Sequence, residues 1–204
     1  MQIDFIFSIL ILIFSVVVHE VAHGYAAYKL GDNTAKFQGR LTLNPIKHLE
    51  WFGSFILPAL SYFMGGFILG WAKPVPYNPY NLRDQKWGEA RVAFAGPLSN
   101  ICIALVFGLM IRFGVASGFG PEFLQISAMI VLINLVLATF NLVPIPPLDG
   151  SKILFSVLPY RFQSIRESME QNGLFILIFF VFFLWKFILP VVMREFTLIT
   201  GLMG

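Results

Sequence analysis

The segment His19-Glu20-Val21-Ala22-His23 places two imidazoles and a carboxylate within little more than one helical turn. Histidines at positions i and i+4 project from the same face of a helix, so both rings can bind one metal ion. The glutamate after the first histidine is placed to take a proton from a metal-activated water, as in zinc metalloproteases. The segment follows an apolar run, Phe5 to Val18, whose only polar residues are Ser8 and Ser15. The sequence therefore predicts hydrolytic chemistry at membrane depth.

A catalytic zinc site needs a third protein ligand and leaves its fourth position open. Acidic residues near membrane spans are costly, so each of them is a candidate. Asp149 follows the proline-rich segment that begins at Asn141, where the prolines end a helix and Gly150 permits close backbone approach. Two histidines and a carboxylate form an established catalytic zinc set. We therefore expect one zinc ion per chain, with His19, His23 and Asp149 as its ligands.

The composition excludes an ordinary soluble domain. The chain is 57% hydrophobic and 12% charged, with a mean hydropathy of +0.78, whereas soluble domains carry about 25% charged residues. We expect an all-α polytopic membrane protein in the lipid bilayer, forming a single domain over residues 1–204. The net charge of +3 gives no indication of nucleic-acid binding. The single cysteine, Cys102, excludes an intrachain disulfide.

Four apolar segments approach the roughly 20 residues that a membrane-spanning helix needs, at about residues 4–28, 91–113, 123–143 and 173–193. A fifth, residues 51–70, contains glycines and a proline that weaken a straight helix, and residues 71–80 contain three further prolines. We therefore expect a helical bundle of four to five spans, with a re-entrant or extended element near residues 51–80. Irregular backbone at membrane depth is tolerated against protein or a wet cavity, so this element is a candidate wall of the site.

Basic residues cluster in three loops: one after the first span, one before the span at 91–113 and one between the last two spans. This bias predicts that the three loops are cytoplasmic and that the N-terminus is outside. His19 and His23 would then lie in the cytoplasmic half of the first span, roughly 10 Å or more from its end. Gly31 is the expected C-cap glycine of that helix. The basic residues concerned are Lys29, Lys36, Arg40 and Lys47; Lys73, Arg83, Lys86 and Arg91; and Lys152, Arg161 and Arg166.

The combination of HEVAH in a first span with NLVPIPPLDG on a later one resembles the site-2 protease family of intramembrane zinc metalloproteases. A third match is AGPLSN at residues 95–100, which resembles the G-P-x-x-N element of that family. The resemblance covers residue 5 to about residue 160, so we expect a core over 1–160 and an additional C-terminal span at 173–193. The chain resembles a minimal core version of the family, without a PDZ or CBS domain, of bacterial or archaeal type.

The resemblance implies that His19, His23 and Asp149 bind zinc and that Glu20 is the general base, which passes its proton to the leaving amine. Asn141 would bind the substrate backbone or stabilise the oxyanion, and Asn100 would make a similar polar contact near the site.

The implied substrates are transmembrane or juxtamembrane segments of membrane proteins, cut near the cytoplasmic face of a prokaryotic cell membrane. A helical substrate must unwind before a carbonyl can react. The chain between residues 65 and 80 is expected to hold the unwound strand by main-chain pairing.

Alternatives remain open for individual residues. Asp149 could instead cap the short helix expected over 151–158, and Glu89 is the rival carboxylate ligand. Asn141 could be a helix–helix hydrogen-bonding residue, and Asn100 could equally be structural.

Two other functions also remain open. The protein could be an inactive family member that binds membrane proteins, although the intact Glu20 argues against this. It could also be a metal transporter, although the sequence shows no internal repeats.

Overall fold

The computed structural model describes residues 2–50, 56, 73–114, 118–183 and 185–202. Regular structure in these residues is helical, and no strand occurs among them. The helices are α1 (Gln2–Lys29), α2 (Thr34–Phe37), η1 (Pro45–His48), η3 (Pro79–Asn81), α4 (Gly88–Gly114), α5 (Pro121–Asn141), α6 (Asp149–Val157), η4 (Tyr160–Phe162), α7 (Gln163–Gln171), α8 (Gly173–Phe183) and α9 (Trp185–Thr200).

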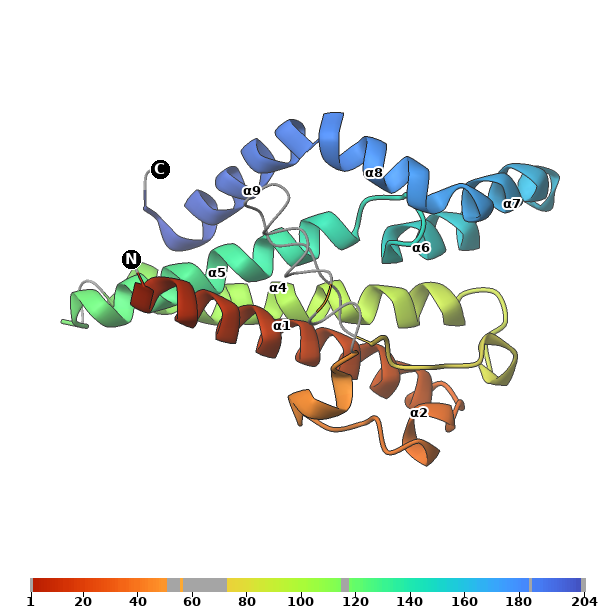
Figure 1. Cartoon of the computed structure of the whole chain (residues 1–204), viewed down its shortest axis with the longest axis horizontal. Helices are drawn as coiled ribbons and strands as arrows, with labels where there is room; N and C mark the ends of the chain where they lie inside the picture. Colours follow the sequence, from red (N-terminus) through yellow and green to blue (C-terminus); the bar gives the residue numbers. More distant parts are fainter. Residues whose placement is uncertain (1, 51–55, 57–72, 115–117, 184, 203–204) are drawn as a thin grey trace.

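Within the described residues, three helices are long and apolar enough to cross a membrane: residues Phe7–Lys29 of α1, the whole of α4 and the whole of α5. They coincide with the spans predicted at 4–28, 91–113 and 123–143, which confirms a helical polytopic membrane protein. The three helices lie side by side, and α4 contacts both α1 and α5 (Figure 1). Small residues on α4 permit close packing: Ala104 lies in a buried cluster with Val131 and Leu135 of α5, and a Cβ atom added at Gly108 would meet Ile199 of α9.

The segment predicted as one span at 173–193 forms two helices, α8 and α9, inclined to each other by 70°. Taken as one bent span they raise the number of candidate spans in the described residues from three to four. Hydropathy measures apolar length and carries no signal for a change in direction. α9 packs on α4 and α5, where Val192 joins a buried cluster with Ile111 and Leu135.

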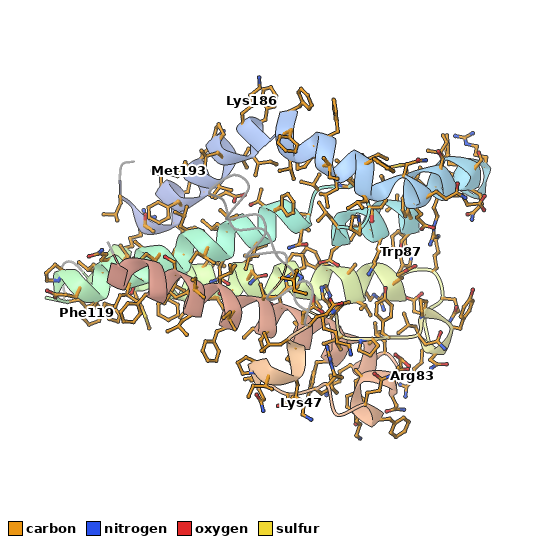
Figure 2. The ribbon with its side chains drawn as sticks, viewed as in Figure 1. Lys47, Arg83, Trp87, Phe119, Lys186 and Met193 are labelled. Atoms are coloured by element: carbon orange, nitrogen blue, oxygen red, sulfur yellow. The ribbon has the colours of Figure 1, made fainter. Side chains whose placement is uncertain are left out.

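The loops predicted to be cytoplasmic lie at one end of the bundle. Figure 2 shows Arg83 and Trp87 toward this end, Phe119 at the other end, and Lys47 beside the middle of the bundle. The third loop joins them, because Arg166 of α7 forms an ion pair with Glu89 of α4 at 4.0 Å. The assignment of the three loops to the cytoplasmic side stays a prediction.

The predicted element near residues 51–80 is described in part. Residues 51–55 and 57–72 lie outside the described residues, as do Gly65 and Gly66 in the segment expected to pair with substrate. Residues 73–78 have no regular secondary structure, as their prolines predicted, and Asn78 has an extended conformation. We call residues 73–83 the proline-rich strap. It runs along the C-terminal half of α1 (Figure 1), where the N–H of Arg83 donates to the carbonyl of Leu30 at 2.8 Å.

The turn after α1 anchors the strap. Gly31 adopts φ +114°, so it fills the predicted glycine position at the helix end. The next residue, Asp32, is fully buried and accepts hydrogen bonds from the N–H of Asn78 at 2.9 Å and the amide of Asn81 at 2.8 Å. Burial alone would raise the pKa of Asp32, but hydrogen bonds from Thr34, Asn81 and Asn78 outweigh it and hold the pKa below its usual range. Asp32 therefore stays ionised and keeps the strap fixed to α1 at neutral pH.

Candidate metal centre

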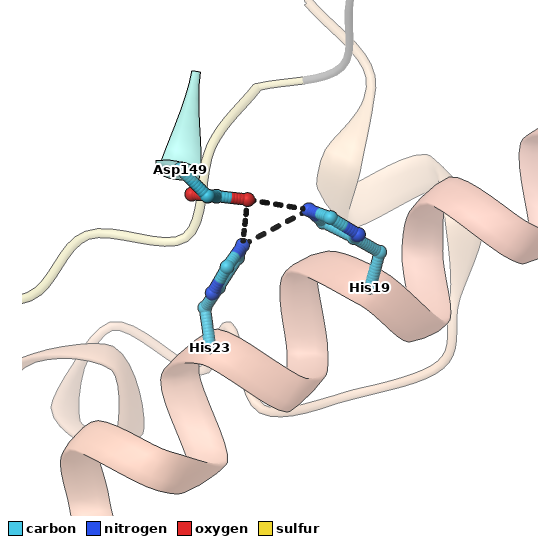
Figure 3. Close-up of side chains that lie close together, drawn as sticks. All are labelled: His19, His23 and Asp149. Carbon is cyan, nitrogen blue, oxygen red and sulfur yellow. Dashed lines mark hydrogen bonds and ion pairs between the residues drawn. The ribbon is translucent and has the colours of Figure 1, made fainter. Parts of the chain in front are cut away.

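Three side chains from two helices meet at one point. His19 and His23 project from the same face of α1, and Asp149 is the first residue of α6 (Figure 3). Asp149 Oδ2 lies 3.1 Å from Nε2 of each histidine, and the two Nε2 atoms lie 3.0 Å apart. All three residues are buried. Among the described residues they form the only group of this kind that could hold a metal ion.

The other ring nitrogen of each histidine fixes its tautomer. Nδ1 of His23 lies 2.7 Å from the carbonyl oxygen of Val92, and Nδ1 of His19 lies 2.6 Å from Oδ1 of Asn100. Both oxygens are acceptors, so Nδ1 of each ring carries the proton and Nε2 presents a lone pair. Three electron-pair donors thus face one another, which repels them unless a cation or a shared proton lies between them. Tetrahedral zinc ligands are about 3.3 Å apart, given zinc–ligand bonds of 2.0–2.1 Å, so the donor set fits a zinc ion.

A chain of buried amides extends from His19. Asn100 of α4 accepts from His19 and donates through Nδ2 to Oδ1 of Asn134 on α5 at 2.8 Å. Asn134 donates in turn to Oγ of Ser15 at 2.9 Å. Asn100 and Asn134 are fully buried. Partners of this kind orient metal-binding histidines and set their basicity. Sequence reasoning singled out Asn100 and missed Asn134, although a lone asparagine in an apolar span is itself a signal.

Two glycines permit the approach of α4 and α6 to this group. A Cβ atom added at Gly96 of α4 would lie 2.6 Å from Nε2 of His19 and still closer to the ring of His23. A Cβ atom added at Gly150 would meet the backbone of Leu142 and Val143. Gly150 therefore allows the close backbone approach that the sequence predicted. Gly96, from the AGPLSN segment, lies directly against both histidine rings.

Gly96→Ala should consequently displace both imidazoles and lower the zinc content of the purified protein. The neighbours are rings held at Nδ1, so they cannot give way without loss of a hydrogen bond. Metal analysis measures the effect. Gly120→Ala is the matched control, because the nearest atom to its added Cβ lies 3.4 Å away, at ordinary contact distance. Full zinc content in Gly96→Ala would show that the rings have room to move.

In the described structure, no hydrogen bond joins Glu20 to His19, His23 or Asp149. Its Oε2 accepts the N–H of Val75 in the strap at 2.8 Å. Glu20, the predicted general base, is therefore held by the strap, which lies more than 50 residues after it in the sequence.

The structure also places the remaining candidates. Asn141 donates to the carbonyl of Leu137 in its own helix at 2.9 Å, and no hydrogen bond joins it to the histidines or Asp149 in the described residues. The Asp149 carboxylate faces Nε2 of both histidines at 3.1 Å and accepts no backbone N–H within the described residues, so a capping role finds no support. α6 spans Asp149–Val157, close to the helix expected over 151–158.

The rival ligand Glu89 belongs to a separate polar cluster. It accepts a hydrogen bond from the hydroxyl of Tyr77 at 3.3 Å and pairs with Arg166. The ammonium of Lys152 lies 5.1 Å from the centre of the Tyr77 ring. Burial raises the pKa of Tyr77, so it remains a neutral donor to Glu89. These contacts join the strap to α4, α6 and α7 beside the metal centre.

Apolar helices of spanning length, together with a buried HExxH pair facing a carboxylate, define a metalloprotease embedded in the membrane. The model of peptidase family M50 matches residues 7–125 and 119–184. The chain belongs to this family, the site-2 proteases, and is a zinc metalloprotease.

Three relatives carry the designation "Putative zinc metalloprotease". YwhC of Bacillus subtilis is 38% identical over 190 residues, which are 90% of this chain and 81% of the relative. Rip2 of Mycolicibacterium smegmatis is 31% identical over 80% of this chain and 62% of its own length. A protein of Methanocaldococcus jannaschii is 32% identical over 72% of each chain. No solved structure matches this chain.

Proposed function

We propose that this protein is an intramembrane endopeptidase in which His19, His23 and Asp149 bind a single zinc ion. The observation that carries the proposal is the convergence of three lone-pair donors at 3.0–3.1 Å. We also propose that residues 1–204 act as one protease domain, with a core over 1–160. The family match, which extends over residues 7–184, supports this unit.

Zinc at these ligands would polarise the scissile carbonyl and make water a stronger nucleophile. Glu20 takes a proton from the attacking water as the new C–O bond forms. It then gives this proton to the leaving amine as the C–N bond breaks, so the step balances in protons. Asn100 holds His19 in the tautomer that presents Nε2, and its bond to Asn134 keeps the amide in place.

Asn141 remains our candidate for the substrate backbone or the oxyanion. In the described structure its Nδ2 donates to the Leu137 carbonyl, and because a primary amide has a second N–H and an acceptor oxygen, this bond is compatible with contact to substrate. A helical substrate hides its carbonyls in its own hydrogen bonds and must unwind locally. We propose that the substrates are transmembrane or juxtamembrane segments of membrane proteins.

Reconstituted enzyme should cleave a synthetic transmembrane peptide that carries a fluorophore and a quencher on either side of a glycine-destabilised helix. A chelator should abolish cleavage, and added zinc should restore it, since binding is reversible when the ligands are intact. The same peptide with an undisturbed leucine helix is the control and should react more slowly. Cleavage that persists after zinc is removed, with zinc loss verified by metal analysis, would contradict the proposal.

We further propose that the site faces the cytoplasm of a prokaryotic cell, because the three basic loops share one end of the bundle. In a Cys102→Ala background, single cysteines at Lys36, Arg83 and Arg161 should be labelled from the cytoplasmic side only. Cysteines at residues 118–120 should be labelled from outside. Labelling of Lys36 and Arg83 positions from opposite sides would contradict the shared end, and labelling of all three from outside would invert the proposed orientation.

A further inference from the structure

The strap offers the Glu20 carboxylate one backbone donor between two prolines. Residues 73–76 read Lys-Pro-Val-Pro, and proline has no backbone N–H. Val75 therefore carries the only N–H of the three residues 74–76, and it donates to Oε2 of Glu20 at 2.8 Å. Glu20 accepts no other hydrogen bond within the described part of the chain. Within the described residues, a single backbone group thus holds one oxygen of this carboxylate.

Both sides of this contact are held in place. The guanidinium of Arg40 donates to the carbonyls of Lys73 at 2.8 Å and Pro74 at 3.3 Å. The side chain of Val75 is 5% exposed and packs where α1 carries Gly24. A Cβ atom at Gly24 would lie 2.6 Å from Cγ1 of Val75, so only glycine lets the strap lie this close to α1. Further along the strap, Asp32 accepts hydrogen bonds from Asn78 and Asn81, so the Val75 N–H is held in place before any substrate binds.

We propose that the N–H of Val75 is a positioning group for catalysis: it holds one carboxylate oxygen of Glu20 so that the other is directed at the attacking water. The inference rests on the proposed role of Glu20 as the general base. A free glutamate side chain samples many rotamers, and fixing it consumes side-chain entropy. A charge-assisted hydrogen bond from a rigid backbone group supplies that restraint. The flanking prolines prevent neighbouring amides from competing for the same carboxylate.

A different role would leave a different signature. If the Val75 N–H held Glu20 away from the water, as a latch, its removal would accelerate cleavage. If the strap only supported the fold, its removal would lower the zinc content and the amount of folded protein together. A positioning group acts on the chemical step alone, so its removal lowers kcat and leaves KM and bound zinc unchanged.

The test compares Val75→Pro, which lacks the N–H, with Val75→Ala, which keeps it and loses two buried methyl groups. With the fluorogenic transmembrane peptide, kcat of Val75→Pro should be at least about tenfold below that of Val75→Ala, at equal KM and zinc content, as expected for loss of a hydrogen bond to a charged group. Equal kcat values in the two variants, or a higher kcat in Val75→Pro, would overturn the proposal.

Replacement of Val75 by its α-hydroxy acid covers the case in which Val75→Pro does not fold. This change turns the amide into an ester and removes the N–H while it keeps the side chain. It should reproduce the loss in kcat. Combined with Glu20→Asp, whose shorter side chain no longer reaches the donor in the same way, the ester should cost much less than in wild type. Activity of Glu20→Gln distinguishes the two ideas: substantial activity there refutes the general base, whereas an inactive Glu20→Gln with a fully active ester refutes only the positioning role.

Discussion

Glu20→Gln should keep its zinc and lose about 10²–10⁴-fold in kcat, the contribution of a well-placed general base. The amide has nearly the shape of the carboxylate, but it cannot take a proton from water. Zinc should remain, because Glu20 is not part of the converging group of His19, His23 and Asp149. Metal analysis and cleavage of the fluorogenic peptide, measured on the same preparation, separate the two effects.

Glu167→Gln is the control for this substitution, since Glu167 is exposed on α7, where it accepts a hydrogen bond from Gln163. It makes the same chemical change far from the site and should retain wild-type kcat. Substantial cleavage by Glu20→Gln would remove the proposed general base. Loss of zinc from Glu20→Gln would instead show that the carboxylate takes part in metal binding.

Asp149→Ala should lower zinc affinity by more than the 10- to 100-fold that removal of an outer-shell partner typically causes. The carboxylate supplies one of the three converging donors and their only full negative charge. Its loss leaves two neutral imidazoles, which are fewer ligands than catalytic zinc sites use. Titration with a competing chelator measures the affinity, and activity should fall in parallel.

Glu89→Ala is the matched variant, because Glu89 is the acid that rivals Asp149 in the sequence. Its carboxylate binds Tyr77 and Arg166, so its removal should leave zinc bound. Full zinc in Asp149→Ala together with zinc loss in Glu89→Ala would show that the third ligand has been assigned to the wrong residue.

Local sequence was sufficient for the parts of this site that depend on local geometry. The i, i+4 spacing of His19 and His23 fixes both rings on one helix face wherever the helix lies. The prolines after Asn141 end α5, and α6 begins at Asp149, so the carboxylate can face another element. Apolar length predicted three spans that the structure contains.

The contacts between helices that complete the site could not be predicted from local sequence. His19 bonds to Asn100, and through it to Asn134, only because three helices cross at those positions, and the crossing depends on which small residues pack. Asn134 also donates to the carbonyl of Ile130 in its own helix at 2.9 Å, much as Asn141 donates to Leu137, so an asparagine in an apolar span does not by itself indicate a partner on another helix. The inclination of α8 against α9 is likewise absent from the hydropathy of an evenly apolar segment.

What the sequence by itself determined, then, is the class of protein and the three side chains that converge, because motif spacing and hydropathy are properties of short segments. What only the tertiary structure decided is how those groups are held. Gly96 lies against both histidine rings, and the Val75 N–H in the strap donates a hydrogen bond to Glu20. The bond from Val75 uses a backbone N–H, which nearly every residue type possesses. The contact depends on the path of the chain and on the prolines beside Val75. The presence of a valine at position 75 therefore does not indicate that Glu20 is its partner.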